Sequence, residues 1–196
     1  MTTTGSRTRT GSQLRDELLA AATDLLSERL AITPPSLRET ARVVGVSATA
    51  VYRYFPSQQE LLLAIASQSL ASLEAVLGTC QDEASGGEDP VVRVRSMAVT
   101  YATWAVANPG AYQLLFEGRD LLDESARIDL GIDRLQADLE SLLQDLPAGG
   151  RDKQVRAELL WTALHGLVVT RIRKTRQQWR RPLAEDAVAL VDAFIS

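Results

Sequence analysis

Apolar residues recur every three to four positions over most of this chain, a spacing that is typical of amphipathic helices. Proline and glycine lie mostly between the periodic stretches, where they end or restart helices. The pattern predicts about nine helices: two short ones within 36–55, another within 108–116, and longer ones over 12–28, 57–80, 90–107, 121–146, 152–174 and 183–195. Few short stretches look like strands, so we expect an all-α fold.

The segment Ser36–Phe55 has the pattern of two short helices around a tight turn. Leu37, Ala41 and Val44 form one apolar stripe on the first helix. Gly45 follows, and glycine permits the positive φ that commonly ends a helix. The spacing predicts a helix-turn-helix, which delivers its second helix to the DNA major groove. An ordinary helical hairpin of another all-α protein has the same local pattern.

The second helix of this motif is expected to start at Ser47, whose hydroxyl is placed to accept hydrogen bonds from backbone N–H groups two or three residues further on. Val51 should point back at the first helix. The outward face then carries a methyl, a hydroxyl, a phenol and a guanidinium, from Ala48, Thr49, Tyr52 and Arg53. Small residues allow close approach to a groove, and the polar ones reach base edges and phosphates.

The same residues form a longer signature: Gly45-Val46-Ser47, then Val51-Tyr52-Arg53-Tyr54-Phe55, then Ser57 and Glu60-Leu61-Leu62. This series resembles the signature of the TetR (tetracycline-repressor) family of bacterial transcription regulators, and the resemblance covers roughly residues 12–75. Two positions depart from the family pattern: Gln58 stands where a lysine is usual, and Thr40 where an isoleucine is usual. Glutamine can hydrogen-bond a phosphate oxygen but releases no counterion, so this contact should be weaker and less salt-sensitive.

Residues 1–11 have no apolar pattern and are expected to be a disordered arm. The resemblance implies a TetR-type helix-turn-helix DNA-binding domain (12–72, motif 36–55) and a C-terminal ligand-binding and dimerisation domain (73–196). The expected contacts to bases or grooves are those of Thr49, Tyr52 and Arg53, with the small Ala48 beside them. The expected phosphate contacts are those of Ser36, Arg38, Ser47, Tyr54 and Gln58. Arg7 and Arg9 in the arm either reach an adjacent groove or belong to a solubilising tail.

A second resemblance covers roughly residues 85–180. The segments NPGAYQLLF (108–116) and LWTALHGL (160–167) resemble the C-terminal domain of the Trp-His-Gly branch of the TetR family. This implies an all-helical regulatory domain with an unknown small-molecule effector. The candidate pocket residues are Tyr101, Trp104, Phe116, Trp161 and His165, and we rank Trp104 and Phe116 first because they flank the break at 108–112. His165, the only histidine, either anchors the core or hydrogen-bonds a ligand.

Composition and charge indicate the cellular compartment of the protein. The chain has 196 residues and a formal net charge of -4, with the first 60 residues slightly basic and the remainder acidic. Its single cysteine, Cys80, fits a reducing compartment, and neither a long apolar run nor a secretory signal is present. We therefore expect a cytoplasmic protein that associates with the nucleoid through DNA. Six basic residues lie near Trp179 in the stretch 171–181. This pattern is typical either of a solvated helix end and loop or of a second nucleic-acid contact.

An enzyme is not expected, because the sequence has no phosphate-binding glycine loop, no pair of histidines and no nucleophile elbow. We predict no catalytic residue, metal site or cofactor. The expected function is that of a ligand-released homodimeric repressor on a palindromic operator. The family resemblance implies a dimer formed by the last two long helices, about 152–174 and 183–195. The alternative is a ligand-binding or protein-interaction module with weak or lost DNA binding. The effector, the regulated genes and the choice between repression and activation stay open.

Overall fold

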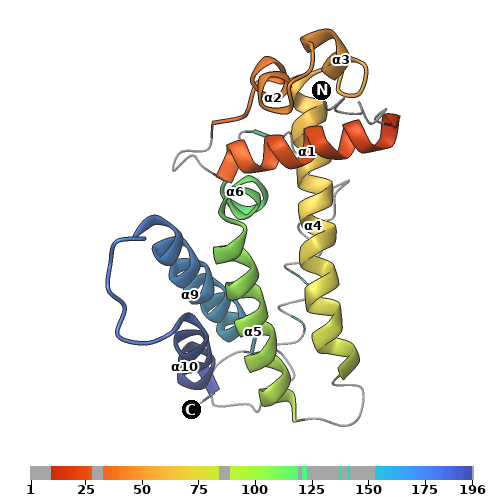
Figure 1. Ribbon diagram of the computed structural model, residues 1–196. Coiled ribbons are helices and arrows are strands. Elements are labelled where there is room, and N and C mark those ends of the chain that lie inside the picture. Colours follow the sequence, from red (N-terminus) through yellow and green to blue (C-terminus); the bar gives the residue numbers. More distant parts are fainter. Residues whose placement is uncertain are drawn as a thin grey trace, which may run out of the picture.

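The computed structural model describes residues 10–27, 33–83, 89–118, 121–122, 137, 141 and 153–195, apart from the side chains of residues 79–83, 153 and 195. Every regular element in these ranges is a helix (Figure 1), which confirms the all-α class. The elements are α1 (Gly11–Ser27), α2 (Leu37–Val44), α3 (Ala48–Tyr52), α4 (Gln58–Glu83), α5 (Pro90–Ala107), α6 (Pro109–Tyr112), the π-helix η2 (Gln113–Glu117), α9 (Lys153–Arg173) and α10 (Leu183–Ile195). Almost all of the helix expected over 121–146 lies outside the described residues, as do the side chains of Arg7, Arg9 and Cys80.

Helices α1, α2 and α3 and the start of α4 form a small head at one end of the molecule (Figure 1). Its core holds the fully or almost fully buried side chains of Leu18, Leu26, Val51 and Phe55. Each comes from an apolar position of the periodic pattern. Burying such side chains is the main source of stability for a helix as short as α3, which cannot persist alone.

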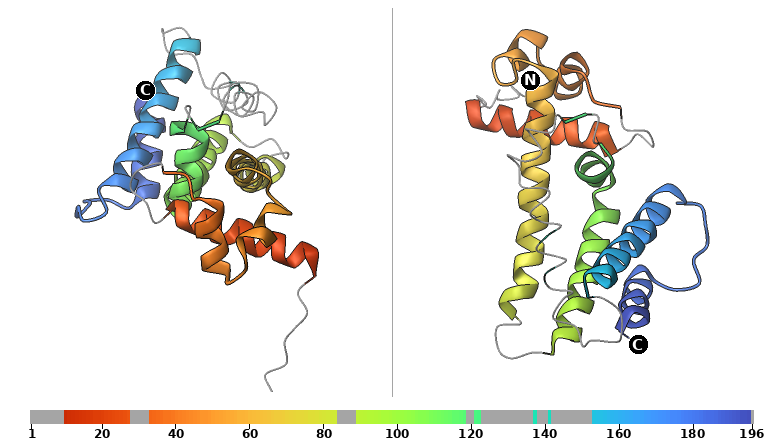
Figure 2. Two further views of the ribbon diagram at one scale, coloured as in Figure 1. Left: turned by 90° about the horizontal axis from the view of Figure 1, so that it is seen from above. Right: turned by 180° about the vertical axis from the view of Figure 1, so that it is seen from behind.

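Helix α4 runs from the head along the length of the molecule (Figures 1 and 2). Its segment Gln58–Gly78 has the length and mean hydropathy of a membrane-spanning helix. However, Leu61, Ile65 and Leu73 on α4 are fully buried in the core that α4 shares with α1 and α5. We therefore attribute the apolar character of this segment to core packing. The predicted boundary between domains at 72/73 falls inside this continuous helix.

Helix α5 is the centre of the body, with α4 on one side and the α9–α10 pair on the other (Figure 2). One cluster of buried side chains connects all of these helices with the head. The observed bounds of α5 and α10 equal those predicted from the sequence, and those of α1 and α9 agree within about one residue. Helix α4 extends three residues beyond the predicted end at Cys80.

Helix α6 connects the body to the head, because it packs on the C-terminal end of α1. The contact is close at Gly110, where a Cβ atom would lie 2.6 Å from the backbone nitrogen of Ser27 and 2.8 Å from the carbonyl carbon of Leu26. Only glycine fits between these backbones. Pro109 starts the helix at a position where its missing N–H costs nothing.

Candidate DNA-binding and effector sites

The turn between α2 and α3 has the local geometry that the sequence predicts. Gly45 ends α2 in the left-handed region, with φ 74°. The hydroxyl oxygens of Ser36 and Ser47 each accept a hydrogen bond of 3.2 Å from a backbone N–H three residues on, at Glu39 and Ala50. These caps satisfy N–H groups that a helix N-terminus otherwise leaves unpaired. Neither hydroxyl donates a hydrogen bond to another described residue, so both serine protons can meet a phosphate oxygen.

Thr40 replaces the apolar residue that the family pattern has at this position, and the structure shows how it is accommodated. Its side chain is fully buried, and its hydroxyl donates a hydrogen bond of 3.1 Å to the carbonyl oxygen of Ser36. A buried hydroxyl with a partner carries little penalty compared with one left unpaired. The departure at Thr40 therefore leaves the packing of α2 intact.

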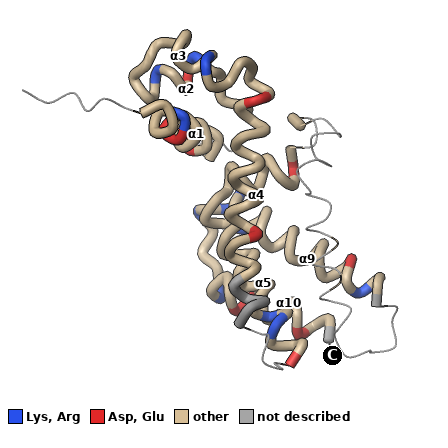
Figure 3. The backbone as a smooth tube through the Cα atoms, turned by 90° about the vertical axis from the view of Figure 1, so that its right-hand side faces the viewer, with Lys and Arg blue, Asp and Glu red and all other residues tan. Residues whose placement is uncertain are grey.

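The outer face of α3 carries the groove residues expected from the sequence. Val51 is fully buried, whereas Thr49, Tyr52 and Arg53 are exposed and the small Ala48 is half-buried. Tyr52 is 48% exposed, an unusual value for a large aromatic side chain in a well-packed head. Figure 3 shows basic residues beside α2 and α3 at one end of the molecule, where α2 carries Arg38 and Arg42 and Arg53 caps the C-terminus of α3. The side chains are therefore placed for DNA contact, and the contact itself stays a prediction.

The residues predicted to contact phosphates differ in their exposure and in their hydrogen bonds within the head. Arg38 is exposed on α2, and Tyr54 is half-buried after α3. The side-chain amide of Gln58 donates hydrogen bonds to the carbonyl oxygens of Pro34 (3.3 Å) and Pro35 (3.1 Å). Both amide protons are thus used to hold the segment that precedes α2. The phosphate contact of Gln58 stays a prediction. In this structure the side-chain N–H donors of Gln58 already bind carbonyl oxygens inside the head.

The body brings four of the five candidate pocket residues into one aromatic cluster, made of Tyr101, Phe116, Trp161 and His165 together with Tyr112. The Tyr101 hydroxyl and His165 Nδ1 share a hydrogen bond of 2.8 Å. The ring centroids of Trp161 and His165 are 4.4 Å apart. Our sequence reasoning missed Tyr112, although it lies in the same NPGAYQLLF segment as Phe116.

Trp104 lies apart from this cluster. Its indole Nε1 donates a hydrogen bond of 3.1 Å to the hydroxyl of Ser72 on α4. The side chain of Trp104 faces α4, while Tyr101, one turn earlier on α5, contacts α9. Trp104 is thus separate from the other four pocket candidates, and its role in a ligand pocket stays a prediction. Because α5 is packed on both sides, it buries more than one face, and neighbouring apolar positions can belong to different sites.

Burial sets the protonation states of the cluster. Desolvation lowers the pKa of His165 from 6.5 to about 4. Burial likewise raises the pKa of Tyr101 and of Tyr112 above the usual value of 10. At neutral pH the histidine is uncharged and both tyrosines are protonated, so the cluster is a neutral, largely apolar environment.

Acidification should destabilise the protein through His165. The folded state binds this proton only near pH 4, whereas an unfolded histidine binds it near pH 6.5, so stability falls as the pH is lowered between these values. The loss is at most about 3 kcal/mol at about 1.4 kcal/mol per pKa unit. Urea unfolding at pH 7 and pH 4.5, for the wild type and His165→Gln, measures it. Equal pH dependence in both proteins would contradict the assignment.

Three of the six basic residues in 171–181, namely Arg171, Arg173 and Arg181, pair with acidic side chains of the body. The guanidinium of Arg171 contacts Asp186 and lies 4.2 Å from the centroid of the Trp179 ring. Arg181 Nε pairs with Asp186 at 2.9 Å, and Arg173 pairs with Glu117 at 2.7 Å. The contacts of Asp186 hold the connection between α9 and α10, and the Arg173–Glu117 pair joins α9 to η2. The arrangement favours a structural role over a second nucleic-acid contact, which stays untested.

Removing the charge of Asp186 should therefore weaken the fold. In Asp186→Asn, the Arg171 side chain, which is 9% exposed, loses its carboxylate partner, and such a loss costs about 2–4 kcal/mol. Asp192→Asn is a matched control, because the Arg95–Asp192 pair is 41% and 44% exposed and should contribute less than about 1 kcal/mol. Denaturant titration of both variants measures the difference. Equal losses would refute the special role of Asp186.

Taken together, the capped helix-turn-helix, its exposed second helix and the all-helical body define a DNA-binding regulator. The chain belongs to the TetR family: residues 94–194 match the family model described as "Tetracyclin repressor-like, C-terminal domain", and residues 18–65 match "Bacterial regulatory proteins, tetR family". Regulators of this family bind DNA, dimerise and are not enzymes. The protein is accordingly a DNA-binding transcriptional regulator. Its assignment to the Trp-His-Gly branch stays a prediction.

Individual proteins show the same likeness over most of the chain. The nucleoid occlusion factor SlmA of Vibrio cholerae serotype O1 is 27% identical over 137 residues, which is 67% of each protein. The solved TetR-family regulator PfmR of Thermus thermophilus has a TM-score of 0.71 at 22% identity, covering 92% of this chain and 97% of that one. The structure of AibR, solved with isovaleryl coenzyme A and operator DNA, has a TM-score of 0.67 at 19% identity, covering 92% and 97%. The two solved structures support the fold.

Proposed function

We propose that the protein is a homodimeric repressor that binds a palindromic operator and is released by a small molecule. The observation that carries this proposal is the outer face of α3, where Thr49, Tyr52 and the C-cap residue Arg53 are exposed, while Val51 on the inner side is buried. A helix with one buried face and one exposed face suits the major groove, because its buried residues fix it in the head and its exposed residues can meet base edges. We place the protein in the cytoplasm, on the nucleoid.

A dimer is part of the proposal because one recognition helix reads only a few base pairs, and two copies spaced by a helical turn provide affinity and specificity. We propose that α9 and α10 form the interface. Val155 and Leu159 on α9 are 44% and 42% exposed, which is high for side chains of this kind on a long body helix. Gly166 further along α9 has no atom within 4 Å of its Cβ position, so a second copy of the helix can approach closely there.

For the effector we propose the aromatic cluster of Tyr101, Tyr112, Phe116, Trp161 and His165. The buried Tyr112 hydroxyl is close enough to the Tyr101 hydroxyl for the two to affect each other's pKa, but it makes no hydrogen bond within 3.5 Å among the described residues, so a ligand atom can use it. The cluster contacts the π-helix η2, a helix type that is frequent at functional sites. AibR, which shares this fold, was solved with an acyl coenzyme A. The proposal here is limited to a small, mainly apolar effector.

Selection of bound sequences from a random pool of double-stranded DNA tests the repressor function. We expect a palindrome whose half-sites lie about one helical turn apart. The affinity for the selected site should then fall linearly on a plot of log affinity against log salt concentration. Failure to enrich any sequence, together with no binding at low salt, would favour the alternative of a module that has lost DNA binding.

A further inference from the structure

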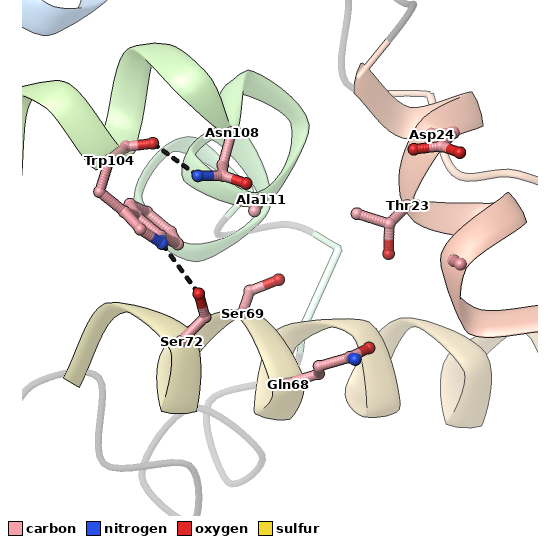
Figure 4. A pocket seen from close by; sticks show the side chains of 9 residues that line it. Thr23, Asp24, Gln68, Ser69, Ser72, Trp104, Asn108 and Ala111 are labelled. Carbon is pink, nitrogen blue, oxygen red and sulfur yellow. Dashed lines mark hydrogen bonds between the residues drawn. The ribbon is translucent and has the colours of Figure 1, made fainter. Parts of the chain in front are cut away.

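A second cavity lies where the head meets the body, separate from the aromatic cluster (Figure 4). It has a volume of about 230 Å³. Its lining comes from α1, α4 and the junction of α5 and α6: Ala20, Thr23, Asp24, Gln68, Ser69, Ser72, Trp104, Asn108 and Ala111. Drug-sized ligands occupy cavities of about 300–1,000 Å³, so this one suits a smaller molecule. None of the residues of the aromatic cluster lines it.

The cavity contains polar groups that the fold leaves available. Ser69 is only 7% exposed, its hydroxyl makes no hydrogen bond to any described residue, and its side chain points into the cavity (Figure 4). The Ser69 oxygen is not among the fully buried atoms that lack a partner, so a water molecule or a ligand in the cavity can reach it. The hydroxyl oxygen of Ser72 accepts from Trp104 Nε1, which leaves its own proton to donate.

The other polar groups are mainly acceptors. Asn108 Nδ2 donates to the carbonyl oxygen of Trp104 at 2.8 Å, so its Oδ1 is left to accept. The hydroxyl of Thr23 donates to the carbonyl oxygen of Leu19 at 2.9 Å, so towards a ligand it too can only accept. Asp24 contributes two carboxylate oxygens and is the one ionisable side chain in the lining. Gln68, whose side-chain amide can both donate and accept, also lines the cavity. The lining thus carries one negative charge, on the exposed Asp24, and more acceptor oxygens than donors, which favours a cationic ligand with N–H donors.

We propose that this cavity binds a small aliphatic amine in its protonated form. The ammonium group pairs with Asp24, and further N–H donors meet the oxygens of Ser69 and Asn108. Because Asp24 belongs to the head and Ser69 and Asn108 belong to the body, a bound amine holds α1 against α4 and α6. By linkage, such a ligand changes operator affinity when the DNA-bound head takes a different tilt. The site is thus a second regulatory position, distinct from the effector cluster.

A four-carbon series of equal length tests the chemistry: 1,4-diaminobutane, 1,4-butanediol and succinate. The readout is the indole N–H resonance of Trp104 in the full-length protein, because this group lies at the cavity, while the indole of Trp179 serves as an internal reference. We expect a saturable shift of the Trp104 resonance with the diamine, a weaker one with the diol, and none with succinate. The Trp179 resonance should stay unchanged.

Two variants with the same change of charge provide the control. Asp24→Asn should weaken diamine binding by about tenfold or more, the size expected for loss of a charge-assisted hydrogen bond. Asp16→Asn, on the same helix but outside the cavity lining, should bind as the wild type does. No saturable shift with the diamine, equal shifts with all three compounds, or wild-type binding by Asp24→Asn would each overturn the proposal. The assay uses no DNA, so its outcome is independent of the repressor function.

Discussion

Replacing Tyr52 with alanine is expected to lower operator affinity by about a hundredfold or more, while the dimer stays folded. A side-chain contact to a base contributes about 1–3 kcal/mol, and a dimer loses it in both half-sites. Each 1.4 kcal/mol corresponds to about a factor of ten in affinity. Tyr52 is 48% exposed and does not belong to the buried core, so its loss should leave the free energy of unfolding nearly unchanged. Titration of the selected operator and thermal unfolding measure the two quantities.

Two further variants show which part of Tyr52 contributes to DNA binding and whether the loss is specific to this position. Tyr52→Phe removes only the hydroxyl and shows whether the phenol acts through its hydrogen bond or its ring. Val92→Ala removes a comparably exposed apolar side chain, 40% exposed on α5, and should leave DNA binding unchanged. Operator affinity within about threefold of the wild type for Tyr52→Ala would remove Tyr52 from the proposed interface.

Replacing Gly110 with alanine should separate α6 from α1. The added Cβ would lie 2.6 Å from the backbone nitrogen of Ser27, and a backbone cannot move aside as a flexible side chain can. Forcing an atom into packed structure costs about 1–3 kcal/mol. Since α6 is in contact with α1 of the head, the displacement should also change operator affinity and the effect of the effector on it. Thermal unfolding and operator titration with and without effector measure these changes.

Gly78→Ala is the matched control for this substitution. Gly78 lies within α4 and has no atom within 4 Å of its Cβ position, so alanine has room there. In a helix interior this change stabilises by about 0.5–1 kcal/mol, because alanine loses less backbone entropy. The same chemical change should thus have opposite signs at Gly78 and Gly110. A Gly110→Ala protein with wild-type stability and wild-type operator affinity would show that the contact between α1 and α6 tolerates the extra atom.

Much of the head could be predicted because its signals are local. Ser36 and Ser47 cap helices through backbone groups three residues away, and Gly45 adopts a conformation that depends on glycine itself. The bonds of Gln58 to Pro34 and Pro35 could not be predicted in this way. They join groups 24 and 23 residues apart, and their existence depends on how α4 packs beside the segment before α2.

The sequence by itself determined the helices, the turn that orients α3 and the side chains on its outer face, because helical periodicity and capping act within a few residues. The tertiary structure alone decided which aromatic side chains meet. Tyr101 and Trp104 lie three positions apart on α5, yet one bonds to His165 on α9 and the other to Ser72 on α4. Periodicity reports that a side chain is buried, but the neighbours of a helix that is packed on both sides depend on the path of the whole chain.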